Sequence, residues 1–110
     1  MQSVLKALAE PRRVAILTLL QGGEMRAGDI AKQFETTRPA ISEHLRVLTD
    51  AGLLVLRREG TSRIYAVRSE GFAELRDFLD RFWDDRLARL KTVVEREARK
   101  PARRVRRRPR

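Results

Sequence analysis

Side chains that can bind nucleic acid gather on one side of residues 37–51, a segment whose other side is apolar. Ile41, Leu45 and Leu48 recur at four- and three-residue spacing, which predicts a helix with one buried stripe. The outward face carries hydroxyl, carboxylate, imidazole and guanidinium groups, which can reach phosphates or base edges in a DNA groove. The predicted contact residues of this segment are Thr37, Arg38, Pro39, Ser42, Glu43, His44 and Arg46.

These side chains differ in the contacts that they favour. Arg38 and Arg46 are expected to bind phosphates, whereas the three residues with the reach to touch base edges are Ser42, Glu43 and His44. The Glu43 carboxylate could accept a hydrogen bond from a cytosine amine. For His44, the only histidine, a DNA contact or partial packing on the core is favoured over a pH switch or a ligand role.

A second short helical pattern precedes this helix, and the polar residues 35–37 separate the two. Its apolar residues are Ile30, Ala31 and Phe34. Thr36 or Thr37 can cap the following helix, and Pro39 is tolerated in its first turn. Gly52 can take the left-handed conformation that ends it. Two short helices joined by a polar turn predict a helix-turn-helix.

After Gly52, two β-prone runs joined at residues 59–62 predict a β-hairpin. The residues expected to share its packed face are Val55, Ile64, Tyr65 and Val67. Its strand ends and tip carry cations and hydroxyls that can contact phosphates or a minor groove. These predicted contacts are Arg57, Arg58, Thr61, Ser62 and Arg63. A hairpin that follows a helix-turn-helix is a wing, which we expect at residues 57–64.

The segments before residue 27 are predicted to support the helix-turn-helix. Residues 3–10 have the spacing of a short helix that Ser3 can cap. Pro11 ends that helix and begins a second one, over residues 11–21, whose many apolar side chains make it central to the core. Residues 24–26 leave room only for a single β-bridge.

Residues 69–98 return to a helical pattern and hold most of the aromatic side chains. The main apolar stripe of this helix consists of Phe72, Leu75, Leu79, Phe82 and Leu90. Phe78 and Trp83 widen the stripe beyond what one core contact needs, so we expect a partner helix. For Phe78, Phe82 and Trp83, packing against that partner is favoured over a ligand pocket.

The charge of the chain is concentrated at one end. The formal net charge is +10, which favours nucleic acid or an anionic membrane as partner. Eight of the 25 basic residues and no acidic residue lie in residues 99–110, which leaves residues 1–98 with a net charge of only +2. We therefore expect one folded domain, 1–98, and a disordered basic tail, 99–110. The tail either adds phosphate contacts of no sequence preference or has no specific role.

Several function classes are not expected. The chain has no cysteine, which excludes disulfides, thiolate metal sites and cysteine nucleophiles. With one histidine and no Gly-rich phosphate loop, neither an enzyme nor a cofactor is predicted. No metal site is predicted, because the acidic residues of the last helix offer only hard oxygen ligands: Asp77, Asp80, Asp84 and Asp85. Without a signal segment or a membrane-spanning run, we expect a cytoplasmic protein with no membrane partner.

The predicted order of elements resembles that of the ArsR-type winged-helix transcriptional repressors. The segments that carry the resemblance are LAEPRRVAILTLL, GDIAKQF, RPAISEHLRVLTDAGLL and REGTSRIYAV. The resemblance covers nearly the whole chain except the tail. It implies a mainly α fold with a small β-hairpin, and a homodimer that binds double-stranded DNA at an inverted-repeat operator. The helix at 37–51 would lie in the major groove and the wing at the flanking minor groove.

The resemblance also implies that the terminal helices form the dimer interface. The residues concerned are Val4, Leu5, Leu8, Phe72, Leu75, Phe78, Leu79, Phe82 and Trp83. Many members of this family sense metals through cysteines near the recognition helix, or through histidine and acidic residues on the last helix. This chain has neither set, so it resembles the metal-independent members. It also has the acidic Glu43 where the family frequently has a basic or amide residue.

Two alternative functions remain for such a chain. An architectural protein would coat DNA through the basic tail and would show little sequence preference. An inducer-gated repressor would need a metal, small molecule or partner protein that releases the operator, and the sequence does not identify one. Activation of transcription in place of repression is a further possibility that the residues do not distinguish.

Overall fold

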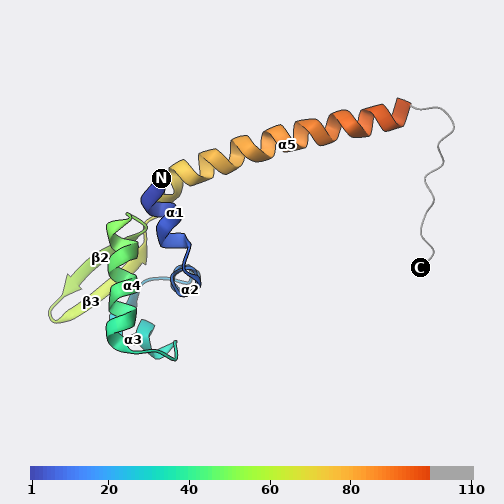
Figure 1. The fold of residues 1–110 in the computed structure, drawn as a ribbon. Coiled ribbons are helices and arrows are strands. Elements are labelled where there is room, and N and C mark those ends of the chain that lie inside the picture. Colours follow the sequence, from blue (N-terminus) through green and yellow to red (C-terminus); the bar gives the residue numbers. More distant parts are fainter. Residues whose placement is uncertain (100–110) are drawn as a thin grey trace. The chain divides into compact units, whose positions relative to one another are not determined.

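The computed structural model describes residues 1–99, so the predicted tail, 99–110, lies outside the described residues except for Arg99, the last residue of a helix. The chain forms two compact units, Met1–Arg76 and a second that begins at Asp77. The first contains eight of the nine elements of the described residues and the start of the ninth, and Figure 1 labels most of them. In chain order these are α1 Gln2–Leu8, α2 Pro11–Leu20, β1 Met25–Arg26, α3 Ala27–Lys32, α4 Arg38–Asp50, β2 Leu54–Glu59, β3 Ser62–Val67, the 3-10 helix η1 Ser69–Phe72 and α5 Ala73–Arg99.

The core of the first unit forms where α2, α3 and α4 meet. The apolar stripe predicted for the second helix of the helix-turn-helix is buried, with Ile41, Leu45 and Leu48 at most 1% exposed. Ile16 of α2 and Ile30 of α3 are fully buried in the same cluster. Burying each such side chain contributes about 1.5–3 kcal/mol to folding. The packing therefore fixes which face of α4 is directed outward.

Local signals set the ends of α4 as predicted. The Thr37 hydroxyl accepts a hydrogen bond from the Ala40 backbone N–H at 3.2 Å, and Pro39 lies in the first turn. Gly52 follows the helix with a φ of 79°. The expected cap at Ser3 is wrong: α1 begins one residue earlier, with Met1 as its N-cap and no side-chain cap, so Ser3 lies inside the helix.

The wing hairpin belongs to a three-stranded antiparallel sheet of order β1-β3-β2, in which the short β1 occupies the position of the expected bridge. The register places Leu56 opposite Tyr65, and this face packs on the core. The predicted packed face is wrong in part, because Val55 pairs with Ala66 on the other face and is 47% exposed. Since side chains alternate along a strand, Ile64 also lies on that other face, where it is buried near β1.

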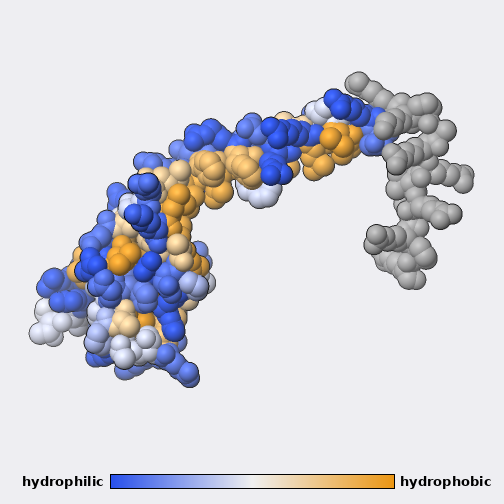
Figure 2. Space-filling view, viewed as in Figure 1, coloured by the Kyte–Doolittle hydropathy of each residue, from blue (hydrophilic) through white to orange (hydrophobic). Residues whose placement is uncertain are grey.

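The second unit consists, among the described residues, of α5 from Asp77 onward. Figure 2 shows a band of hydrophobic side chains along this helix. Its large apolar residues are between 41% and 57% exposed: Phe78, Leu79, Phe82, Trp83, Leu87, Leu90, Val93 and Val94. By contrast, Phe72 and Leu75 are partly buried against the core of the first unit. The wide apolar stripe predicted for this helix is present, and among the described residues nothing covers it from Phe78 onward.

A close backbone contact joins η1 to the end of α4. A Cβ atom at Gly71 would lie 2.0 Å from the carbonyl oxygen of Gly52, whereas a Cβ at Gly22 would lie 3.6 Å from its nearest neighbour, the Leu19 carbonyl oxygen. The first distance is far below van der Waals contact, and the Gly52 carbonyl belongs to the backbone, which cannot move aside as the end of a flexible side chain can. Only glycine fits at position 71 without a shift of η1 or of the turn after α4.

We therefore expect Gly71→Ala to lower the free energy of unfolding by about 1–3 kcal/mol through overpacking. Chemical denaturation followed by circular dichroism measures this change. Gly22→Ala is the matched control, because its added methyl group makes only ordinary contact and should change stability little. Equal stability of the Gly71→Ala variant and the parent would show that the η1 contact is looser than described.

Candidate nucleic-acid interface

The predicted contact residues of α4 do not all face outward. Thr37, Arg38 and Pro39 are exposed at the start of the helix, and Ser42, Glu43 and Arg46 are exposed farther along it. His44 is half-buried and lies next to the buried stripe of the helix. The structure thus brings the charged and hydroxyl groups onto one exposed face but leaves the imidazole at its edge.

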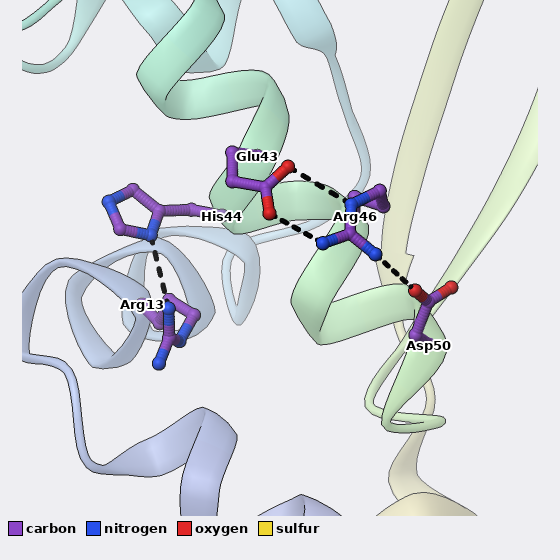
Figure 3. A network of polar contacts seen from close by, with 5 residues as sticks. All are labelled: Arg13, Glu43, His44, Arg46 and Asp50. Carbon is purple, nitrogen blue, oxygen red and sulfur yellow. Dashed lines mark hydrogen bonds and ion pairs between the residues drawn. The ribbon is translucent and has the colours of Figure 1, made fainter.

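His44 lies against α2 because Arg13 holds it there. The Arg13 Nη1 lies 3.4 Å from the His44 Nδ1, and a dashed line in Figure 3 marks this contact. The same guanidinium donates to the carbonyl oxygens of Ala7 at 2.7 Å and Lys6 at 3.1 Å, in the last turn of α1. Arg13 therefore binds two carbonyls at the end of one helix and a side chain of another. Of the favoured interpretations of His44, partial packing describes its position in this structure.

Arg46 is engaged by two carboxylates of its own helix (Figure 3). Its Nε and Nη2 donate to the two carboxylate oxygens of Glu43 at 3.0 and 2.5 Å, and its Nη1 donates to Asp50 at 2.8 Å. The hydrogen bond from Arg46 lowers the pKa of Glu43, and the bond to Glu43 raises the pKa of Arg46. The guanidinium that was expected to bind phosphate is thus held by carboxylates in the chain without DNA.

Arg38 lies over the preceding helix. Its Nη2 would be 3.2 Å from a Cβ atom at Gly28, so the absence of a side chain there leaves room for the guanidinium against α3. No carboxylate of the described residues forms an ion pair with Arg38. Of the two arginines predicted on α4, Arg38 is the one whose charge is available for an anion.

The wing arginines also differ from one another. Arg57 donates to Glu24 at 2.6 Å and lies 3.5 Å from a Glu59 oxygen, which raises its pKa. Arg58 and Arg63 lie directly opposite each other on β2 and β3, and both are exposed. Like charges at opposed positions destabilise a hairpin. This pair therefore concentrates positive charge near the tip and lowers the stability of the hairpin, an effect that a bound anion would offset.

Thr61 and Ser62 complete the predicted wing set at the tip. Thr61 is exposed beside Gly60, whose φ of 58° makes the turn, and Ser62 is half-buried where it begins β3.

In the described part of the chain, no group of three potential metal ligands lies together, and no helix is long and apolar enough to cross a membrane.

Three features of this surface were missed from the sequence. Arg13 and His44 are 31 residues apart, and no local pattern indicates that they meet. The binding of Arg57 to Glu24 likewise joins distant residues. The pairing of Glu43 with Arg46 is different, since carboxylate and guanidinium three residues apart on a helix are neighbours, and this spacing was a signal that could have found it.

A helix-turn-helix with a charged outward face, followed by a β-wing with opposed arginines, defines a winged-helix DNA-binding protein. The family model described as "Bacterial regulatory protein, arsR family" matches residues 10–54. The HTH-type transcriptional regulator Rv2034 of Mycobacterium tuberculosis is 39% identical over 92 residues, which are 84% of this chain and 86% of that protein. The chain belongs to the arsR family and is a DNA-binding transcriptional regulator.

Other relatives support the same assignment. The transcriptional repressor SdpR of Bacillus subtilis is 42% identical over 63% of this chain and 77% of its own length. The solution structure of the homodimeric winged helix-turn-helix DNA-binding domain Mb0332 from Mycobacterium bovis is 36% identical, with a TM-score of 0.61 over 76% of this chain and 78% of that one. The predicted mainly α winged-helix fold and the family resemblance are confirmed.

Proposed function

We propose that this regulator is a homodimeric repressor that occupies an inverted-repeat operator, with α4 in the major groove and the wing at the flanking minor groove. The observation that carries the proposal is the rigid placement of α4: its apolar stripe is buried, its start is capped by Thr37, and its polar face is exposed. The repressor function named for SdpR and the homodimer named for Mb0332 support the same assignment.

The apolar band of α5 is the basis for the dimer. Monomeric proteins rarely expose a continuous apolar surface of this kind, and such surfaces usually contact another chain. We assign this face to a second copy, because two identical helices can pack their bands together about a two-fold axis. The proposed interface residues on α5 are Phe78, Leu79, Phe82 and Trp83, and Leu5 of α1, which is also exposed, belongs to the same proposed set.

Some residues predicted at the interface already have contacts within one chain. Val4 is only 7% exposed and belongs to the core, so it anchors α1 to the first unit. Leu8, Phe72 and Leu75 are partly buried against the same core. These four side chains are proposed to position the interface. The exposed parts of Leu8, Phe72 and Leu75 are proposed to contact the second copy as well.

The DNA contacts are proposed from the charge of each side chain in the free protein. Arg38, Arg58 and Arg63 are assigned to phosphates, because they are exposed and no carboxylate of the described residues is paired with them. Ser42 and Glu43 are assigned to base edges, and Thr37, Pro39, Thr61 and Ser62 to the surrounding backbone contacts. The basic residues from 99 onward are proposed to add phosphate contacts of no sequence preference.

The experiment that tests the function is footprinting of the purified full-length protein on the DNA upstream of its own gene, at near-physiological salt with excess competitor DNA. A compact, two-fold symmetric footprint that overlaps the promoter is the expected result for a dimeric repressor. Diffuse protection that disappears under competitor would instead favour the architectural protein, and selection from random DNA would then show whether any sequence is preferred.

Arg63→Ala should weaken binding to all DNA sequences to a similar degree. It should also reduce the salt slope, which is the slope of log affinity against log salt concentration, by about 0.9 for each wing that loses a phosphate contact. Its folding stability should not fall, because the substitution removes repulsion with Arg58. Fluorescence anisotropy across a salt series and chemical denaturation measure the two effects. Arg57→Ala is the control, and a larger loss of salt slope for it than for Arg63→Ala would reverse the assignment.

Trp83→Ala should weaken the dimer by about 2 kcal/mol, or roughly 30-fold in dissociation constant, as expected for a buried aromatic anchor. Sedimentation equilibrium over a range of protein concentrations measures this constant. Asp84→Ala, the adjacent position on a different side of the helix, should leave association unchanged. If the Trp83 variant sediments like the parent, the interface lies elsewhere.

A further inference from the structure

The exposed face of α4 carries more negative than positive charge around Arg46. Glu43 and Asp50 both bind this one guanidinium, and the three side chains are between 58% and 64% exposed. A helix that enters a groove lined by phosphates is repelled by carboxylates, which lower its affinity for every sequence. The two acidic residues therefore weaken nonspecific binding, and an additional contact is needed to explain binding at a specific site.

The geometry of Glu43 allows such a contact. Both of its oxygens accept from Arg46, which fixes the plane of the carboxylate. A carboxylate offers about four lone-pair sites, so the two bonds from Arg46 leave capacity for a further donor. A side chain that is already held in place loses little conformational entropy when it binds. Glu43 is thus an oriented acceptor on the outward face of the proposed reading helix.

The major groove contains few donors for an oriented acceptor. Guanine presents only acceptors there, and thymine presents an acceptor and a methyl group. Adenine has an amine, but its N7 acceptor lies beside that amine and would repel the carboxylate. Cytosine presents its N4 amine without a second acceptor of its own. The chemistry of the groove therefore favours cytosine as the base that Glu43 contacts.

We propose that Glu43 specifies one cytosine in each operator half-site and that Arg46 is a positioning residue for Glu43, in place of the phosphate contact expected from its charge. The proposal rests on the proposed function, because it requires α4 to lie in the major groove. Asp50 binds the far side of Arg46 and has a different effect: its charge lowers affinity for all sequences without touching the choice of base.

The test is selection of preferred sites from a random duplex library with the full-length protein, followed by affinity measurements on the selected site and its single-base variants. The parent should select an inverted repeat that contains a cytosine in each half-site, at which another base costs about tenfold in affinity. Glu43→Gln should lose this preference at that one position, and adenine should become favoured there, since an amide pairs with adenine N6 and N7.

Asp50→Asn is the matched variant, because it removes the same charge from the same face and leaves the two Glu43–Arg46 bonds intact. It should raise affinity for every sequence and leave the selected motif unchanged. Arg46→Ala should broaden the choice at the Glu43 position alone, and Arg46→Lys should restore part of it. A merely structural role of Arg46 would instead reduce affinity without changing the preference at one position.

The outcomes separate this proposal from the function on which it rests. If the parent selects no motif, the proposed function fails. If the parent selects an inverted repeat but Glu43→Gln selects the same one, with or without a general gain in affinity, then Glu43 acts only through its charge and the inference is overturned.

Discussion

The packing of the apolar stripe of α4 against α2 and α3 holds this helix in a single orientation. Ile41, Leu45 and Leu48 are almost completely buried, so the helix cannot rotate without exposing them. This fixed orientation decides which side chains of α4 are exposed, whereas the pairing of Arg46 with Glu43 and Asp50 follows from their spacing along the helix. The wing is held in the same way, because Leu56 and Tyr65 of the sheet pack onto the same core.

Most of the fold could be predicted because its signals are local. The cap at Thr37, the proline in the first turn of α4 and the left-handed Gly52 each act within a few residues of their own position. Strand register is not local in this sense: it depends on how β3 pairs with two neighbours, and the outward position of Val55 follows from that pairing. The sequence pattern of alternating residues could not decide it.

Residue type and spacing do not give the contacts that each charged side chain of the candidate site makes. Charge alone suggests that an arginine on a reading helix binds phosphate, yet Arg46 is bound by neighbours on its own helix. His44 was placed correctly on α4, but its partner Arg13 comes from another helix, and only the tertiary structure brings the two together. A role depends on what each charged group already contacts, and this information is absent from composition and spacing.

The Arg13 guanidinium connects three parts of the first unit that differ in function. It holds the last turn of α1, it belongs to α2, and it contacts His44 of the helix proposed to read DNA. A displacement of α1 would therefore stretch or break the contact with His44. Mechanical strain at the N-terminal helix would in this way reach the reading helix through the Arg13 side chain, in addition to the core that Val4 and Ala7 share with α4.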